Sequence, residues 1–474
     1  MNTMEELTDI ENCLLLATKG TELESRIYLA DESAVYAYFD RPMPTLHLTV
    51  DAPNGAIRLG ERLQEQGLTL GAPTNHWYNG ACLFQLNGYE KIEIHAEQSR
   101  KALPCLDSDR VEDLYVPIAL DSLRRPYTVS ALYRRLCDQE LIDPTSKGIA
   151  DLRIKTLRAL DADLLFDIEP ERILQGIALA VSLDFEIEPG TLEKMTTYTS
   201  RLKRRSLLRM RDWFSEILVS PDPVRGLTLL KELGILEIII PEMSLAYTMS
   251  QNKYHFGTVW EHTLRVVELV PPSLTLRLAA LLHDIGKVMC REVTEDGKVH
   301  FLQHESKGIA IIMSRLLTMR YDRKMAERIA LLSRLHMRTK GWGKDAERMK
   351  ESSLRELQLA TGDPDCFEEL MELIDADNKA HADDYCMPDQ VERIREKSSL
   401  FRSEGRDMFH FQLPFSEEFL KSRLFPYGQV PGCVAYLKEK ACKQPVRSEK
   451  EWLYLVDEFT KRLSQQKLAI IEEE

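Results

Sequence analysis

The sequence has no long apolar run and no pattern of paired cysteines. None of its hydrophobic stretches approaches the roughly 20 residues that a membrane-spanning helix needs, and the first residues, Met1 to Glu6, are acidic. The nine cysteines are scattered without a Cys-x-x-Cys pair, and an odd number cannot all pair within one chain. Scattered reduced thiols are typical of the cytosol. We therefore expect a cytoplasmic protein without a membrane partner.

Positive charge is also scarce. The 62 Lys and Arg residues face 76 Asp and Glu residues, which gives a formal net charge of −14. Such a balance opposes tight non-specific binding to nucleic acid, because contacts with phosphates need local positive charge. A local basic patch remains compatible with it. The 474 residues, 44% of them hydrophobic, are enough for several domains with sizeable cores.

Several predicted helices carry a histidine or an aspartate on an apolar face. Residues three and four positions apart lie on the same face of a helix. By this rule His262, His283, His336 and Asp377 each share a face with aliphatic residues, and His304 begins a further helix with a less regular inner face. We therefore expect these side chains to point into the protein.

Buried carboxylates among these residues indicate a cation site. A single histidine on an apolar face is more often an ordinary core residue, so His336 alone would indicate little. A buried carboxylate, however, is costly unless it is paired or bound to a cation, and imidazole with carboxylate is a ligand set for iron, manganese or zinc. Asp284 follows His283 at a helix end, where it can bridge two ions, and Gly286 provides the helix stop. Lys287 then lies where its ammonium group can meet a phosphate oxygen.

The order of these residues resembles a known family. His262, His283-Asp284 and Asp377 follow the pattern of the HD superfamily of metal-dependent phosphohydrolases, and His304 and His336 resemble its six-ligand, dinuclear branch. The resemblance implies hydrolysis of a phosphate ester or anhydride, commonly of a nucleotide, by a metal-bound hydroxide. It implies two divalent ions, of Mn, Fe, Zn, Ni or Mg, with Asp284 and Lys287 as catalytic residues. The implied ligands are His262, His283, Asp284 and Asp377 for one ion and Asp284, His304 and His336 for the other.

The first hundred residues differ from the rest of the chain. Alternating apolar residues predict strands at 45–50, 81–86 and 91–95, with short helices between them. Beyond about residue 106 the pattern is helix after helix, apart from a hairpin at 291–301. We therefore predict a mainly α chain with a small N-terminal α/β domain. The expected domains are 1–136 (α/β), 137–245 (helical neck), 246–385 (metal-binding) and 386–474 (helical tail).

Three segments carry a second resemblance. They are Arg124-Arg-Pro-Tyr-Thr-Val-Ser-Ala-Leu, Phe166-Asp-Ile-Glu-Pro-Glu-Arg and Gly226-Leu-Thr-Leu-Leu-Lys-Glu-Leu-Gly-Ile-Leu. In order and spacing, residues 25 to 245 resemble the head and neck of the tRNA nucleotidyltransferase and poly(A) polymerase family, members of which often carry an HD domain at this place. The resemblance implies a nucleotidyltransferase-like domain at 1–136. Arg124, Arg125 and Arg172 then correspond to a nucleotide or RNA surface, and the alternative is that they are solvated or paired with nearby acids.

The residues that transfer a nucleotide in that family are replaced here. Transfer needs two carboxylates two residues apart on one face of a strand, which hold two magnesium ions, but the corresponding positions read His47 and Thr49. The turn expected to hold the triphosphate reads Ala30-Asp31-Glu32-Ser33, and its acidic side chains would repel phosphate. Glu93 is one carboxylate that remains nearby. We therefore expect an inactive head.

Together these patterns favour an HD-domain phosphohydrolase, a phosphodiesterase or phosphatase acting on a nucleotide or an RNA 3′-end phosphate, with an inactive nucleotidyltransferase-like head. Lys287, Arg124, Arg125 and Arg172 would bind the substrate, and tRNA is a candidate partner. Two alternatives stay open. One is a head that retains nucleotidyltransferase activity and adds CCA or poly(A), and the other is a non-catalytic regulator that binds RNA or a nucleotide. The basic run 201–211 suits RNA contact and a solvated helix face alike.

Overall fold

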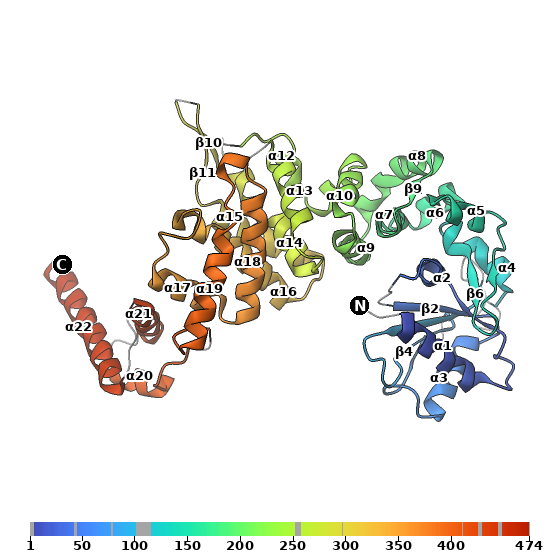
Figure 1. Ribbon diagram of the computed structural model, residues 1–474, viewed down its shortest axis with the longest axis horizontal. Helices are drawn as coiled ribbons and strands as arrows, with labels where there is room; N and C mark the ends of the chain where they lie inside the picture. The colour runs from blue at the N-terminus through green and yellow to red at the C-terminus, as the bar shows by residue number, and fades with distance from the viewer. Residues whose placement is uncertain are drawn as a thin grey trace. The chain divides into compact units, whose positions relative to one another are not determined.

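The chain folds into two compact units. The computed structural model describes residues 4–41, 45–76, 79–100, 115–251, 257–295, 297–409, 411–424, 429–443 and 448–473. The units are Met1–Ile238, which contains a mixed sheet and a run of helices, and Ile239–Glu474, whose described residues form helices and one hairpin (Figure 1). The predicted mainly α fold with a small N-terminal α/β domain is confirmed. The finer division into four domains stays a prediction.

A seven-stranded sheet lies at the start of the first unit. Its order is β3-β4-β5-β2-β1-β6-β7. The pair β2 and β5 is parallel, and the other neighbours are antiparallel. The strands are β1 (Ile27–Leu29), β2 (Thr45–Val50), β3 (Thr74–His76), β4 (Ala81–Phe84), β5 (Glu93–Gln98), β6 (Tyr133–Arg135) and β7 (Leu141–Ile142).

One face of this sheet forms the core of the unit. Alternate residues of a strand point to opposite faces, and Leu46 and Leu48 of β2 are buried with Ile94 of β5. They share their apolar cluster with residues of α1 (Met4–Thr18) and α3 (Gly55–Glu65). The opposite face of β2 and β5 is therefore the more exposed one. The helix α2 (Asp31–Tyr38) begins directly after β1, and Ser33 Oγ accepts a hydrogen bond from the backbone N–H of His47 at 2.8 Å.

The sequence analysis did not predict four short strands after residue 106. We expected no strands between residue 106 and the hairpin, but β6 and β7 complete the sheet. A parallel pair, β8 (Thr156–Leu157) and β9 (Glu186–Ile187), also joins two helical segments. Strands of two or three residues are too short to show an alternating pattern.

Helices follow the sheet in the first unit. The helix α10 begins at Pro223, and the carboxylate of Asp222 accepts the backbone N–H of Arg225, so the first turn is capped. Tyr127 OH donates to the backbone carbonyl of Arg172 at 2.6 Å, which ties α7 to the segment between β5 and β6. The elements are α4 (Ile118–Asp121), η2 (Ser122–Arg124), η3 (Val129–Ala131), α5 (Gly148–Arg153), α6 (Ala162–Ile168), α7 (Arg172–Leu183), α8 (Pro189–Tyr198), η4 (Thr199–Arg204), α9 (Leu207–Val219) and α10 (Pro223–Glu232), with α11 (Leu236–Ile239) at the boundary between the units.

The second unit is a group of helices with one hairpin, β10 (Arg291–Val293) and β11 (Val299–Phe301), which confirms the predicted excursion. A capping box at Thr258 and Glu261 fixes the start of α13. Among the described residues, no helix combines the length and hydrophobicity needed to cross a membrane. The helical elements are α12 (Met243–Ala246), α13 (Val259–Leu269), α14 (Leu274–Leu282), η5 (Ile285–Met289), α15 (His304–Thr318), α16 (Arg323–Leu335), η6 (His336–Trp342), α17 (Glu351–Thr361), α18 (Pro364–Lys379), η7 (Asp383–Tyr385), α19 (Gln390–Ser403), α20 (Glu417–Arg423), α21 (Val430–Lys443) and α22 (Glu449–Glu473).

A buried guanidinium group connects three elements of the first unit. The side chain of Arg125 is 3% exposed and forms ion pairs with Asp121, at 2.9 Å, and with Asp31 at the start of α2. It also donates to Thr49 Oγ1 of β2 at 2.8 Å. Tyr133 OH donates to Asp121 at 2.6 Å. These partners lower the pKa of Asp121 even though burial opposes the shift.

We expect Arg125→Met to destabilise the first unit by about 3 kcal/mol, because it leaves buried carboxylates without their cation. The matched control is Lys194→Met, which removes an exposed, solvent-screened ion pair with Asp163 and should leave the stability nearly unchanged. Hydrogen exchange of peptides from 118–135, followed by mass spectrometry at increasing urea concentrations, measures the difference. Equal protection in the two variants would contradict a stabilising role for Arg125.

The segment η5 packs closely on the start of α15 in the second unit. A Cβ atom added at Gly286 would lie 2.0 Å from the backbone oxygen of His304 and 2.7 Å from the backbone nitrogen of Gly308. Neither backbone atom can move away as a flexible side chain can. Glycine at 286 is therefore what allows the two elements to touch.

We expect Gly286→Ala to push η5 and α15 apart and to destabilise the second unit by about 1–3 kcal/mol. Gly341→Ala is the control, since nothing lies within 4 Å of an added Cβ at that position. The reactivity of the buried Cys290 thiol towards a chromogenic disulfide reports the opening, because this residue follows η5 directly. A thiol that reacts at the wild-type rate in Gly286→Ala would rule out the close contact.

Candidate functional site

Five elements of the second unit bring the predicted ligands together. α13 supplies His262, and α14 ends where His283 and Asp284 follow it. His304 is the first residue of α15, His336 follows α16, and Asp377 lies in the last turn of α18. All of them are buried, with exposed fractions of 0% for His262 and His283, 2% for Asp284 and Asp377, 5% for His304 and 1% for His336.

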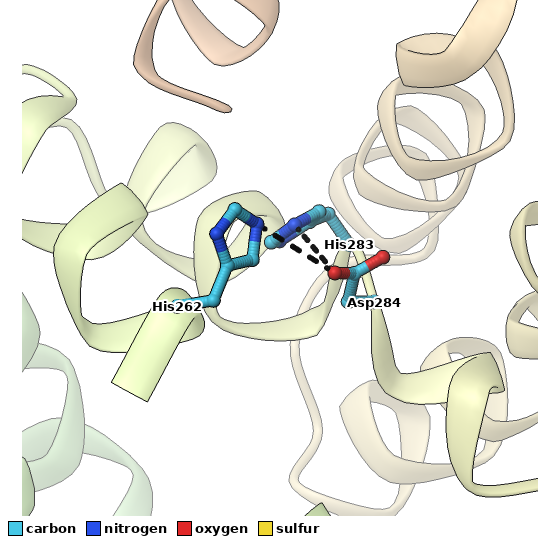
Figure 2. A group of neighbouring side chains, drawn as sticks. All are labelled: His262, His283 and Asp284. Atoms are coloured by element: carbon cyan, nitrogen blue, oxygen red, sulfur yellow. Dashed lines mark ion pairs between the residues drawn. The ribbon is translucent and has the colours of Figure 1, made fainter. Parts of the chain in front are cut away.

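The carboxylate of Asp284 lies at the middle of the cluster. Its Oδ2 atom is 3.2 Å from His283 Nε2 and 3.7 Å from His262 Nε2, and these pairs are drawn in Figure 2. Its Oδ1 atom is 3.1 Å from His304 Nε2 and 3.8 Å from His336 Nε2. The two oxygens of one carboxylate therefore face two different pairs of imidazoles.

Two groups of three residues have the geometry of cation ligands. They are His262, His283 and Asp284, and Asp284, His304 and His336; within each group the ligand atoms all lie within 4.8 Å of one another. Asp377 lies beside the first group, with Oδ1 3.1 Å from His262 Nε2. The structure thus places all six predicted ligand residues in one cluster, and Asp284 is the residue that the two groups share.

Hydrogen bonds from the far side of the rings fix which imidazole nitrogen faces the cluster. The Nδ1 atoms of His283, His304 and His336 lie 2.7, 2.9 and 2.6 Å from the backbone carbonyls of Ala280, Phe301 and Ser333. A carbonyl can only accept, so each Nδ1 donates, and a neutral ring then turns a lone pair on Nε2 towards the cluster. His283 Nε2 is buried and lies 3.2 Å from Asp284 Oδ2, which Lys287 Nζ also approaches at 2.6 Å. A divalent cation between this Nε2 and Oδ2 would bind both atoms.

The charges in the cluster agree with this arrangement. Burial, together with the neighbouring His283 and His304, lowers the pKa of His336 to about 3, so this ring is neutral at ordinary pH. Burial also lowers the pKa of His262. Although burial opposes the shift, His283 and Lys287 hold the pKa of Asp284 well below its usual range. Although burial opposes the shift, Asp284 raises the pKa of His283, so at this ring a metal would compete with a proton.

A cavity of about 480 Å³ adjoins the cluster. Lys287 Nζ lies in it, 2.6 Å from Asp284 Oδ2, and donates to Gln251 Oε1 at 2.7 Å. The Lys340 Nζ atom lies 2.8 Å from Asp377 Oδ2. The residues that line the cavity outside the cluster are Lys287, His300, Phe301, Leu302, Met337, Lys340, Lys344, His381, Tyr385 and Met387.

The sequence analysis missed one polar group that reaches a residue of this cavity. Lys340 lies four residues after His336, at a spacing that indicates a shared face. Gln251 lies outside the segments that we singled out, and nothing in its local pattern indicated that it would reach Lys287. His381, four residues after Asp377, has its Nδ1 atom 2.5 Å from the Asp377 backbone carbonyl, so its ring is held beside the cluster.

The predicted head residues lie in the first unit and form no part of this cluster. Arg124 is 11% exposed and pairs with Glu97 at 2.7 Å and with Asp121 at 2.6 Å. Arg172 is 33% exposed and pairs with Glu169 at 2.8 Å. Arg125 is nearly inaccessible, so a nucleotide would meet Arg124 or Arg172 first.

The acidic turn at the start of α2 is neutralised within the protein. Arg125 pairs with Asp31, and the buried Glu32 accepts a hydrogen bond from the side-chain amide of Gln175. The repulsion of phosphate that we expected from this turn is therefore weakened by these partners.

Comparison with known proteins follows the same division of the chain. Residues 184–246 match the family described as a probable RNA and SrmB-binding site of polymerase A, and residues 259–364 match the HD domain. The recognition of an HD domain beside a polymerase-type neck is confirmed.

Curated relatives and a solved structure give the same picture. The chain is 32% identical over 228 residues to the CC-adding tRNA nucleotidyltransferase of Thermus thermophilus and 30% identical over 229 residues to the A-adding enzyme of Deinococcus radiodurans. Each alignment covers 46% of this chain and 52% of the relative, so the chain spans about half the length of the curated relatives it matches. The Bacillus stearothermophilus CCA-adding enzyme in complex with CTP matches 97% of this chain and 99% of its own, with a TM-score of 0.63 and 16% identity, a likeness of fold.

These findings overturn the activity that we predicted. The sequence favoured an HD phosphohydrolase with an inactive head, but the relatives are named for adding nucleotides to tRNA, and none of the findings supports a hydrolase or phosphodiesterase. The prediction was wrong because a ligand cluster shows where a cation can bind, not which module carries the main reaction.

The described residues thus contain groups able to hold a divalent metal, a segment that matches the probable RNA-binding site of polymerase A, and an HD domain, in a chain whose homologues are tRNA nucleotidyltransferases.

Proposed function

We propose that the chain adds nucleotides to the 3′ end of tRNA through its head. The observation that carries the proposal is the 32% identity over 228 residues to a CC-adding tRNA nucleotidyltransferase. The mixed sheet of the first unit and the polymerase-type segment at 184–246 support it. A cytoplasmic location, where tRNA is the substrate, belongs to the same proposal.

Basic residues between η4 and α9 are suited to the RNA backbone. Arg201 pairs with Asp167 at 2.5 Å, and Arg209 pairs with Glu171 at 2.8 Å. Lys203 and Arg204 are exposed, and no ion pair with another described residue holds them. They offer positive charge to phosphates in a chain whose net charge is −14.

Arg172 is the best placed of the head and neck arginines for reading a base. Its guanidinium donates to Glu169 at 2.8 Å and to Gln175 Oε1 at 3.0 Å, so it is held in one orientation. A fixed guanidinium beside a carboxylate presents donors and acceptors along one edge, and such an edge can distinguish bases. Arg124 lies nearer the sheet and would meet the phosphates.

Divalent ions at the HD cluster are the second part of the proposal. His262, His283, Asp284 and Asp377 would hold one ion, and Asp284, His304 and His336 the other. Imidazole-rich ligand sets favour manganese, iron, zinc or nickel over magnesium. Ions that bind only the folded chain stabilise it, and here they would hold α13 to α16 and α18 together.

A second candidate function is the binding of tRNA ends without nucleotide transfer. One observation favours it: in the described part of the head, Asp31, Glu97 and Asp121 are paired with Arg124 or Arg125, which leaves fewer carboxylates for ions.

Transfer is tested with transcripts of tRNA that end before, within and after the CC of the 3′ terminus, supplied with labelled CTP or ATP and a divalent ion. We expect incorporation on at least one of these ends. Arg172→Ala should lower the rate about 10- to 100-fold, since a charged hydrogen bond contributes about 1.5–3 kcal/mol. Arg153→Ala, an exposed arginine of α5, is the control and should react at the wild-type rate.

Failure on every end, with tRNA binding intact in a filter assay, would reject transfer and leave the binding function. Failure of both transfer and binding would reject the two candidates together.

The metal proposal is tested by the metal content of the purified chain. We expect about two equivalents more in the wild type than in Asp284→Asn, because this carboxylate is shared between the two groups of the HD cluster. His336→Gln should lose only one. Asp375→Asn is the control, because Asp375 lies on the same helix as Asp377 but pairs with Lys379. Unchanged metal in Asp284→Asn would refute the shared site.

A further inference from the structure

The more exposed face of β2 and β5 carries an unusual set of side chains for a strand pair. Thr45 lies beside Glu93, and His47 lies beside His95, in the parallel register of the two strands. These residues alternate with the buried Leu46, Leu48, Ile94 and Ala96 and so lie on the face away from α1 and α3. His95 is 33% exposed and Glu93 is 51% exposed, so solvent reaches both.

The two imidazoles and the carboxylate are close together. The ring centroids of His47 and His95 are 5.3 Å apart and the rings meet edge to face. Glu93 Oε2 lies 2.8 Å from His95 Nε2. The backbone of His47 is held in place by the hydrogen bond that its N–H donates to Ser33.

The spacing of this histidine pair matches that within the HD cluster of the same chain. There the ring centroids are 5.4 Å apart for His262 and His283, and 5.4 Å for His304 and His336. Two rings that bind one tetrahedral ion through nitrogen, at about 2.0–2.1 Å each, have centroids about 5 Å apart. The rings of His47 and His95 therefore have the spacing of two imidazoles that share an ion.

We propose that β2 and β5 bind one divalent transition-metal ion through His47, His95 and Glu93. Among the described residues, two groups of three have ligand atoms that all lie within 4.8 Å of one another, and both are in the HD cluster. The three residues of the head do not form such a group. The site in the head is thus less preorganised, and rotation of the exposed Glu93 and His95 side chains must bring the three ligand atoms together. Water molecules complete the coordination, because the face is open to solvent.

The ligand types decide which ions the site prefers. Magnesium takes oxygen ligands in octahedral geometry, and a pair of carboxylates on one strand would suit it. Two imidazoles with one carboxylate instead suit zinc, cobalt or nickel. The proposed ion therefore differs from the two magnesium ions that nucleotidyl transfer was expected to use. Binding of the ion does not depend on the proposed function, whereas any role of the ion in transfer rests on it.

Metal counting with Zn²⁺ and Co²⁺ tests the site in the full chain. The parent is Asp284→Asn, in which the HD cluster has lost its shared ligand. We expect this parent to keep one equivalent, with a Co²⁺ absorption band typical of nitrogen and oxygen ligands. Adding His47→Gln and His95→Gln should abolish the band and weaken binding at least tenfold. Adding the exposed Glu93→Gln alone should weaken binding less.

His76→Gln is the matched control, because His76 lies on β3 of the same sheet, two strands away from β5. Circular dichroism checks that each variant is folded, and Glu93→Gln keeps the test decisive if the double histidine variant is not. The inference is overturned if the parent binds no ion, or if Glu93→Gln and the histidine variants bind Zn²⁺ as tightly as the parent. Because this assay contains neither tRNA nor nucleotide, a chain that binds the ion but transfers nothing rejects the proposed function and leaves the site standing.

Discussion

The second unit depends on the buried carboxylate of Asp284, which is 2% exposed and faces four imidazoles. A carboxylate in such surroundings raises the free energy of the folded chain unless cations or hydrogen-bond donors offset its desolvation. Donors on the backbone side of the rings are already used, because His283, His304 and His336 donate through Nδ1 to carbonyls. What remains at the centre is a set of lone pairs. Five elements from distant parts of the sequence therefore converge on a point that suits a cation.

In the first unit, guanidinium groups offset the cost of burying a carboxylate. Asp121 is fully buried, and the guanidinium groups of Arg124 and Arg125 neutralise it together with Asp31 and Glu97. A guanidinium is attached to the chain and cannot dissociate, whereas a metal ion exchanges with solution. The fold of the head is thus independent of metal concentration, while that of the HD cluster is linked to it by mass action. The arginines reach the same sheet face at Thr49 of β2 and Glu97 of β5, and His47 and His95 lie two residues before these contacts.

The sequence predicted the HD cluster well because its ligands lie on helices with a clear apolar period. His262, His283, His336 and Asp377 each repeat at helical spacing with aliphatic residues, so their inward direction followed from the pattern alone. The short strands β6 to β9 could not be predicted, since two or three residues show no alternation. Gln251 and the pairing of Asp31 with Arg125 depend on tertiary contacts between segments 36 and 94 residues apart, which no local pattern contains.

The error about activity has a similar origin. His47 and Thr49 stand where two carboxylates would hold two magnesium ions, and from this we predicted an inactive head. Carboxylates, however, are not the only ligands that can hold a cation on the sheet. The register of β2 and β5 sets His47 against His95, with Glu93 adjacent. The strand that lacks the carboxylates thus carries one imidazole, beside a strand that carries an imidazole and a carboxylate. Loss of the expected ligands on one strand therefore does not imply loss of metal binding, because the neighbouring strand can change the donor set and with it the choice of ion.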